Sequence, residues 1–484
     1  MRTSTIATIL LALALGASAS QAEARKFTCA GGDVSCLIAA ISAANASDRP
    51  NIILLSAGVY TLTTPYTGGT TGLPPDAGLP PIAGRLTIVG EAAESTIIER
   101  PSDAEAFRIF TVLGDLTLRG LTIRGGGGQS AVNGGAILAE GRLTIADCVL
   151  TGNRAREGGA IALRNAGKVL DSTIDGNEAI EGAGVLVAGA QAALEMKGST
   201  VAGNRGTFGG GLDVQRGGTA TISNSTFSGN TAFTGSAVQE GIAPDAPVDP
   251  ALFPPGTATI ANSTVAGNRT ATFPFAGRTF DSRLGEISLK GTIVANNVSP
   301  AGDCPRTATS LGFNLIGNAT DCPAFLVATD LTGEAGLGSF VDDAAPGRGY
   351  YPLVPGSQAI DAGGTAPPHK AVNATGDCPP TDQIGQPRVG RCDIGAIEFV
   401  ADRVTIRQSR FDAASETLFV SATSSAVRND VSLAVSVPGC IADQSMLRLD
   451  RSYLFLTTTS CGDIENQTVT ITSTGGGSAS REIR

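Results

Sequence analysis

The sequence has no tryptophan, a single histidine and few charged side chains. Among 484 residues, Asp, Glu, Lys and Arg together make up 16% and aromatic residues 5%, whereas glycine occurs 63 times. The rest of the chain is rich in Val, Ile, Thr, Ser and Asn, a mixture that suits short strands joined by many turns and makes long helices poor candidates. The lack of Trp also weakens any sugar-binding role that depends on ring stacking.

Acidic residues outnumber basic residues. The formal net charge is −10, which argues against a nucleic-acid partner, because such affinity rests mainly on clustered Lys and Arg. Anionic polysaccharides would be repelled overall too, although a local basic groove could override that repulsion.

No apolar run reaches the roughly 20 residues that a membrane-spanning helix needs. The apolar run from Ile6 to Leu15 follows Arg2 and ends in small residues, so residues 1–24 are expected to be a secretory signal peptide cleaved after Ala24 or after Ala22. We therefore expect a secreted or cell-surface protein, extracellular or periplasmic, without a membrane span and monomeric.

Nine cysteines in an exported chain point to disulfides. Proximity along the chain suggests four pairs: Cys29 with Cys36, Cys304 with Cys322, Cys378 with Cys392, and Cys440 with Cys461. Spacing alone does not fix this connectivity. The remaining Cys148 lies in an alternating strand and is expected to be a buried, inert thiol.

Internal repeats are the strongest pattern in the sequence. A strand ending in a Gly-Asn turn recurs with its asparagines at Asn153, Asn177, Asn204, Asn230 and Asn268. A second element lies between them and begins at a glycine pair or triplet, at Gly134, Gly158, Gly182 and Gly209. Each repeat of about 25 residues is therefore two or three short strands separated by turns, too little to bury an apolar core alone.

Stacking the repeats solves that problem. If each repeat makes one coil, equivalent strands pair in parallel about 4.8 Å apart and the crossover rule makes the coil right-handed. The fold expected is all-β: a right-handed, single-stranded parallel β-helix, with the recurring Asn side chains stacked at one corner. The Asn row is interpreted as structural.

The chain can be divided on this basis. We predict an N-terminal cap at 25–50 containing a short amphipathic helix over Cys36 to Asn45, and a parallel β-helix at 51–400. Alternating runs predict a separate β-sandwich-like domain at 403–475, and a Gly- and Ser-rich flexible tail at 476–484. Within the solenoid, Thr64 to Pro81 and Gly241 to Gly256 are expected to project as loops.

Two segments resemble a known group of bacterial right-handed β-helix repeat proteins. Residues 36–45, which begin Cys36-Leu37-Ile38-Ala39, together with 52–62 look like the motif written CSLREA, with Ile38 and Ala39 in place of its charged pair. Residues 352–363 and 381–398 are similar to the C-terminal segment called choice-of-anchor Q. The resemblance implies exported, surface-associated β-helix proteins, mostly without an established activity.

Chemistry is harder to place. Glu157 and Glu181 precede successive glycine turns, so they would stack on one face with Arg154, Arg156 and Arg164 nearby. They are weak candidates for catalysis or for a Ca²⁺ site. The favoured interpretation is that they are exposed turn residues neutralised by the arginines. Asp342-Asp343 and the lone His369 are interpreted as surface-loop residues. The sequence indicates no cofactor, with Ca²⁺ as the one ion left open.

Two functions follow. The first is a non-catalytic binding, adhesin-like or envelope structural protein that contacts polysaccharide or other cell-surface components. The alternative is a polysaccharide lyase or glycoside hydrolase with its site along the β-helix face. Whether the chain is an enzyme stays open at this point.

Overall fold

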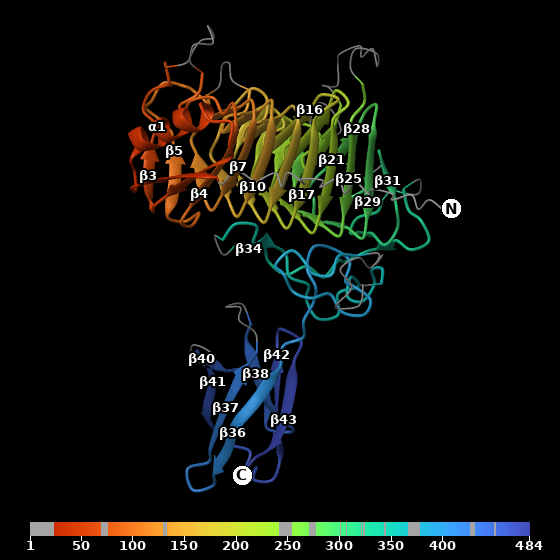
Figure 1. Cartoon of the computed structure of the whole chain (residues 1–484). Helices are drawn as coiled ribbons and strands as arrows, with labels where there is room; N and C mark the ends of the chain where they lie inside the picture. Colours follow the sequence, from red (N-terminus) through yellow and green to blue (C-terminus); the bar gives the residue numbers. More distant parts are fainter. Residues whose placement is uncertain are drawn as a thin grey trace, which may run out of the picture.

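The repeats form successive coils of a right-handed parallel β-helix in the computed structural model (Figure 1). The structure describes residues 24–68, 76–128, 133–241, 254–270, 277–300, 302–305, 307–320, 322, 325–342, 345–365, 378–425, 431–449 and 452–484. The predicted signal peptide and His369 lie outside the described residues, and so do the middle parts of both predicted loops.

Four parallel sheets wrap the solenoid. The A sheet has eleven strands: β1 (Arg25–Cys29), β2 (Asn51–Leu55), β4 (Arg85–Gly90), β7 (Asp115–Arg119), β10 (Arg142–Ala146), β13 (Ala166–Leu170), β17 (Ala193–Lys197), β21 (Thr219–Ser223), β25 (Thr257–Ala261), β29 (Glu286–Lys290) and β31 (Ala308–Ser310). Figure 1 shows most of these strands side by side on the face toward the viewer.

The B sheet follows the A sheet in every coil. It also has eleven strands: β3 (Gly58–Thr61), β5 (Thr96–Glu99), β8 (Thr122–Arg124), β11 (Val149–Thr151), β14 (Thr173–Asp175), β18 (Thr200–Ala202), β22 (Thr226–Ser228), β26 (Thr264–Ala266), β30 (Ile293–Ala295), β32 (Leu315–Ile316) and β33 (Leu331–Thr332).

Two smaller sheets close the coil. The C sheet contains β6 (Phe110–Val112), β9 (Ile137–Ala139), β12 (Ile161–Leu163), β16 (Val185–Ala188), β20 (Leu212–Gln215), β24 (Val238–Glu240) and β28 (Phe280–Ser282). The D sheet contains β15 (Glu178–Glu181), β19 (Arg205–Phe208), β23 (Thr231–Ala232) and β27 (Arg269–Thr270). A coil thus runs from A through B and D to C.

The core of the solenoid comes from the inward positions of the strands. In β10, for example, Leu143 and Ile145 are buried while the residues beside them are partly or fully exposed, the alternation that a pleated strand imposes. Leu143 aligns with Leu116 of the preceding coil, so apolar side chains stack in continuous rows along the axis. One hydrophobic cluster therefore extends through the coils.

Asparagines occupy the corner after the B sheet, as the repeats predict. The Asn177 Oδ1 atom accepts hydrogen bonds from the backbone N–H and the Nδ2 of Asn153, while Asn177 bonds in the same way to Asn204. Each asparagine is buried. The glycine before it, such as Gly176 with φ of 60°, takes the left-handed backbone conformation that the turn requires.

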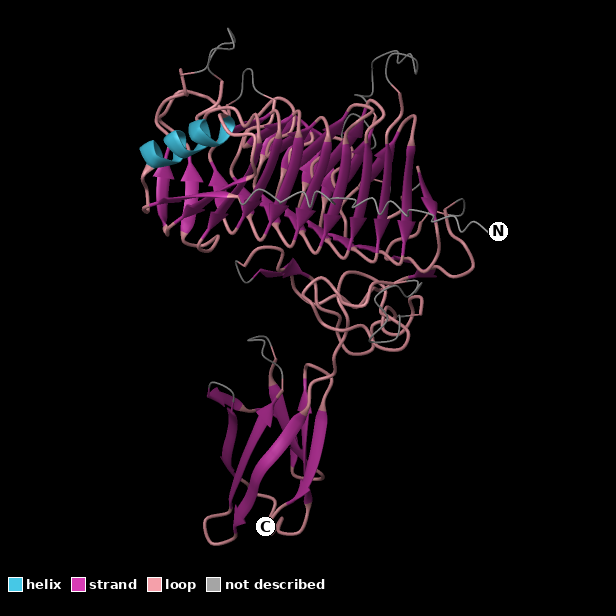
Figure 2. Cartoon of the chain, in the orientation of Figure 1, coloured by secondary structure: helices cyan, strands magenta, loops and turns pink. Residues whose placement is uncertain are grey.

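The predicted capping helix covers the N-terminal end of the solenoid (Figure 2). Helix α1 (Val34–Asn45) begins after Asp33, whose carboxylate accepts a hydrogen bond from the Cys36 N–H at 2.9 Å. Leu37 and Ile41 are fully buried against the first coils.

The predicted β-helix boundary at 400 is wrong. Parallel coils end at β33, and the described residues after it, 333–342, 345–365 and 378–399, turn back along the outer face of the B sheet (Figure 1). A short hairpin of β34 (Val341–Asp342) and β35 (Gly349–Tyr350) belongs to this segment, which we call the return segment. Its Gly349 N–H bonds to Thr200 of β18 and its Ala396 N–H to Thr264 of β26. Its many turns lack the repeat's inward alternation, so it packs on a sheet instead of extending the stack.

The C-terminal domain is a β-sandwich of two antiparallel sheets. One sheet contains β36 (Val404–Asp412), β37 (Thr417–Ser424), β41 (Ser452–Thr458) and β40 (Leu447–Leu449). The other contains β39 (Ile441–Ser445), β38 (Leu433–Val437), β42 (Thr468–Ser473) and β43 (Ser478–Glu482). The residues between these sheets form a core of their own.

The prediction of a flexible tail at 476–484 is also wrong. Strand β43 pairs with β42 along five residues, and Ile483 is fully buried in the sandwich core. The Gly-rich stretch before it is the turn of a hairpin. Glycine abundance favoured flexibility in the sequence, but the pairing partner and the core site for Ile483 decide the outcome.

All four disulfides suggested by the sequence are present: Cys29–Cys36, Cys304–Cys322, Cys378–Cys392 and Cys440–Cys461. They indicate an oxidising compartment outside the cytoplasm. Cys148 is free and buried, and burial raises the pKa of its thiol to about 12. Within the described residues, no helix is long and apolar enough to cross a membrane.

Candidate functional site

Glu157 and Glu181 lie one coil apart in the same register, as the repeat spacing predicts. They form a parallel bridge in which the Gly158 N–H donates to the Glu181 carbonyl at 2.8 Å. Both precede a glycine turn that leads into the C sheet. The structure therefore brings these two candidate carboxylates to one side of the solenoid.

The arginines around them are distributed differently from the expectation. Arg164 forms an ion pair with Glu157 at 2.6 Å, and both side chains are less than one-fifth exposed. Arg154 pairs instead with Glu178 at 3.2 Å, and Arg156 is exposed to solvent. Glu157 is thus neutralised by a single arginine, and the structure does not gather all three arginines on the two glutamates.

Glu181 is linked through Gln215 to Asp213, a carboxylate that the sequence pattern did not indicate. The Nε2 atom of Gln215 donates to Glu181 Oε2 at 3.2 Å and to Asp213 Oδ2 at 2.7 Å. Asp213 is fully buried on β20, on the side of the C sheet that faces away from the core. The backbone of Gly209 covers it, since a Cβ at Gly209 would lie only 2.6 Å from the Asp213 Cβ. We call Glu181, Gln215 and Asp213 the buried acidic row.

The electrostatics of this row favour a proton on Asp213. Burial raises the pKa of the Asp213 carboxyl well above its ordinary value, opposed by the Gln215 hydrogen bond and reinforced by the charges of Glu181 and Glu240. Asp213 Oδ1 and Gln215 Oε1 are buried and have no hydrogen-bond partner among the described residues. A proton on Asp213 Oδ1 turns this unpaired acceptor into a donor.

Glu240, one coil further on, has a structural role. Its Oε2 accepts hydrogen bonds from the backbone N–H groups of Arg283, Leu284 and Gly285 and from the Ser282 hydroxyl, while Oε1 accepts from the Gly256 N–H. A buried carboxylate with that many donors holds a turn in place. It has no free oxygen to offer a substrate.

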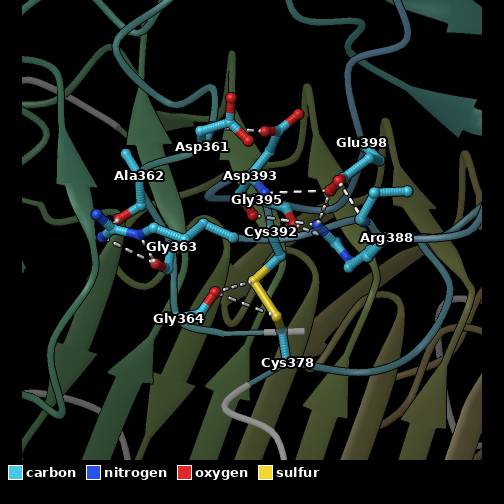
Figure 3. The surroundings of a disulfide bond; sticks show 12 residues. Asp361, Ala362, Gly363, Gly364, Cys378, Arg388, Cys392, Asp393, Gly395 and Glu398 are labelled. Carbon is cyan, nitrogen blue, oxygen red and sulfur yellow. Dashed lines mark hydrogen bonds and ion pairs between the residues drawn. A yellow bond between two sulfur atoms is a disulfide. The ribbon is translucent and has the colours of Figure 1, made fainter. Parts of the chain in front are cut away.

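A second buried charged cluster fixes the return segment (Figure 3). Arg388 is almost completely buried and pairs with Glu398 at 3.2 Å while donating to the carbonyls of Asp393 and Gly395. The Cys378–Cys392 disulfide lies beside it. Burial, with the neighbouring Glu398 charge, raises the pKa of Asp393 to about 6, although two backbone N–H donors oppose the shift.

The remaining candidates do not form a site. Asp342 lies in β34, and Asp343 lies outside the described residues. Burial raises the pKa of Asp175, and the charge of Asp342 adds to this shift. In the part of the chain that the structure describes, no three His, Cys, Asp or Glu side chains are grouped to hold a metal ion.

Asp213 could have been found by aligning the repeats. The C-sheet position that it occupies is Ala162 and Leu186 in the two preceding coils and Gln239 in the next. A change from apolar to acidic at one position of a regular repeat is a sequence signal. Arg388 and Glu398 lie after the last coil, so no repeat pattern marks their pairing.

Comparison with known proteins supports the fold. Residues 112–243 match a family model described as a right handed beta helix region. A search of solved structures gives ORF18 of Geobacillus virus E2, at 12% identity and a TM-score of 0.29, covering 88% of this chain and 72% of that one. No curated protein matches the sequence.

Proposed function

We propose that the protein is an exported, non-catalytic β-helix protein, secreted or held at the cell surface, that binds glycans or other cell-surface components through the outer face of the A sheet. The observation that carries this proposal is the difference between the sheets. Among the described residues, the return segment packs on the B sheet and turn glycines cover the outer side of the C sheet. The outward side chains of the A sheet, apart from the buried Ser288, are partly or fully exposed.

This open face is regular along the whole solenoid. Its middle outward position forms one row through all eleven strands, in which Lys168 and Glu195 separate two runs of hydroxyl residues. The seven hydroxyl residues are Thr87, Thr117 and Thr144 in the first run, and Thr221, Thr259, Ser288 and Thr309 in the second. A flat array of hydroxyls that repeats every ~4.8 Å suits an extended polymer better than a small ligand.

The motif resemblance agrees with a surface role. The residues similar to the choice-of-anchor Q segment include Asp382, Gln383 and Arg388, which are buried. Gln383 and Arg388 bond to Thr226 and Asn224 of the solenoid, and Asp382 accepts bonds from backbone N–H groups within the return segment. Their polarity is therefore explained by structure, without any need for an active site in this segment. We propose membership of that group and association with the cell surface on this basis.

A polysaccharide lyase or glycoside hydrolase is the second candidate. The buried acidic row favours it, because a carboxyl with a strongly raised pKa beside a second carboxylate is typical of catalytic sites. Asp213 has no exposed surface, however, and Glu157 is tied to Arg164. A substrate could reach Asp213 only if the Gly209 turn moved, so the non-catalytic function is preferred.

The test uses residues 25–484 with a panel of neutral and acidic polysaccharides, with and without Ca²⁺. Binding is measured on a glycan array, and turnover by the absorbance of unsaturated products and by new reducing ends. We expect binding without turnover. Turnover that disappears in Glu181→Gln or Asp213→Asn, but persists in the exposed control Glu195→Gln, would establish the enzyme instead.

A further inference from the structure

Basic residues are concentrated on the A sheet of an otherwise acidic protein. The chain has 34 Lys and Arg against 44 Asp and Glu. The A-sheet strands reverse this balance, with eight basic residues against three acidic ones: Arg25, Lys26, Arg85, Arg119, Arg142, Lys168, Lys197 and Lys290 against Asp115, Glu195 and Glu286. The open face thus carries positive charge that the whole molecule lacks.

The positive charge follows the coils. Five consecutive strands, from β4 to β17, each present one exposed basic side chain: Arg85, Arg119, Arg142, Lys168 and Lys197. Neighbouring strands lie ~4.8 Å apart, so these five cations follow one another coil by coil along the solenoid axis. They occupy different outward positions of their strands and therefore form a broad band, not a straight row.

Hydroxyl groups lie between the cations. Arg85 and Arg142 occupy the first outward position of their strands, and Arg119 and Lys197 the last. The middle position in β4, β7 and β10 is threonine. Thr87, Thr117 and Thr144 therefore have Arg85 and Arg142 on one side, with Asp115 between these two arginines, and Arg119 on the other side.

The existing ion pairs on this face do not block it. Arg119 bonds to Asp147 at 3.0 Å and Lys168 to Glu195, but all four side chains are at least half exposed. Exposed ion pairs of this kind contribute little to stability, so a polyanion can take the place of the protein carboxylates at little cost.

We propose that this face, the basic band together with its threonine row, binds an acidic polysaccharide whose chain lies along the solenoid axis across the strands. Uronate carboxylates pair with the Lys and Arg side chains, and sugar hydroxyls bond to the threonines. The inference rests on the proposed binding function and assigns its surface and its ligand class.

Single-stranded nucleic acid fits the face less well. Strands β4, β7, β10, β13 and β17 contain no aromatic residue, and base stacking on aromatic side chains supplies much of the affinity for single strands. The same composition means that sugar recognition here depends on charge and hydroxyl contacts. Neutral polysaccharides should therefore bind poorly.

The experiment compares polygalacturonate with its fully methyl-esterified form, which keeps the sugar backbone and removes the charge. Binding to residues 25–484 is measured by affinity electrophoresis and calorimetry at low and high salt. The test variant is R85Q/R142Q, because both side chains are exposed and project from alternate strands. The control is R407Q/R410Q, which removes the same charge from exposed positions of β36 in the sandwich.

We expect polygalacturonate to bind, the ester to bind far more weakly, and salt to weaken the interaction. R85Q/R142Q should lose about tenfold in affinity while keeping its unfolding midpoint, and the control should stay within about twofold. Undiminished binding by R85Q/R142Q would refute this face as the site and leave the binding function standing. Failure of folded protein to bind any glycan would refute both. Equal affinity for single-stranded DNA would show that the face selects charge alone, against the polysaccharide assignment.

Discussion

The asparagine at the B-sheet corner shows how one residue type serves two neighbouring coils. Asn177 Nδ2 donates to the carbonyls of Leu150 and Asp175 as well as to Asn204, and its Oδ1 accepts from Asn153. Both ends of the amide are used and none of it is exposed. A buried amide that meets backbone groups of the coils on either side makes the stack continuous.

Replacing Asn177 with alanine should therefore destabilise the solenoid. The change leaves the Asn153 N–H and the Leu150 carbonyl without their partner, at a cost of about 1–3 kcal/mol in the free energy of unfolding. Chemical denaturation measures the difference. The partly exposed Asn133→Ala should change stability by less than about 0.5 kcal/mol. Equal losses in the two variants would contradict the role of the corner.

The raised pKa of Asp213 predicts that the stability of the folded protein depends on pH. Because its pKa is raised in the folded state, both states are protonated below about 4, the unfolded value, and no penalty exists there. As pH rises above that value, the unfolded state gives up its proton first, and folding loses stability until the folded pKa is reached. Asp213→Asn removes this dependence, so the variant should gain stability relative to the wild-type protein between pH 4 and pH 7.

Differential scanning calorimetry of both proteins across this range measures the effect. The exposed Asp463→Asn serves as the control and should follow the wild-type curve. A constant difference in melting temperature between Asp213→Asn and the wild type would mean that Asp213 carries no linked proton. The result bears on function, because a carboxyl that never ionises cannot act as a general base.

At the scale of elements, the sequence predicts strands and helices that have a periodic pattern of apolar residues. It does not predict strands that form only because a neighbouring strand pairs with them. The strands of the repeat and helix α1 follow from alternation and from apolar spacing, since each pattern reports directly on burial. Strand β43 has no such pattern: Ser478 to Glu482 is polar, with a glycine run before it. Only the neighbouring β42 and the pocket that receives Ile483 make it a strand, and neither is visible locally.

Ile483 therefore tests whether the last strand belongs to the sandwich. Ile483→Ala opens a cavity in the sandwich core and should cost about 2–5 kcal/mol. Ser478→Ala, at an exposed position of the adjoining strand β43, should have little effect. Denaturation followed through the sandwich tyrosine, Tyr453, would report the loss. An unfolding midpoint of Ile483→Ala equal to that of the wild-type protein would contradict this packing and favour the predicted flexible tail.

Over the whole molecule, the return segment decides which face of the solenoid stays open. Gln383 bonds to the carbonyls of Gly347 and Gly349 within the segment and accepts from Thr226 of β22, so one side chain joins the segment to the B sheet. The repeat pattern could not predict this contact, because it joins residues more than 150 positions apart that share no periodicity. The same lack of local signal hid Arg388.

Arg388 provides the test of this arrangement. Arg388→Ala leaves the buried Glu398 without its counter-ion and should cost about 3–5 kcal/mol, releasing the segment from the B sheet. Limited proteolysis should then cut residues 345–365 and 378–399 before it cuts the coils. The control Arg348→Ala, at an exposed position of the same segment, should leave cleavage unchanged.

The double variant Arg388→Met/Glu398→Leu separates charge from packing. Replacing both partners by apolar side chains of similar size removes the unpaired charge, so protection against proteolysis should return toward the wild-type level. Persistent cleavage in the double variant would mean that the backbone groups bonded to the pair matter more than the ion pair itself. These are the carbonyls of Asp393 and Gly395, which accept from Arg388, and the N–H groups of Val389 and Asp393, which donate to Glu398. In either case the A sheet is untouched, so polysaccharide binding should survive the release of the return segment, as expected if the two faces have separate roles.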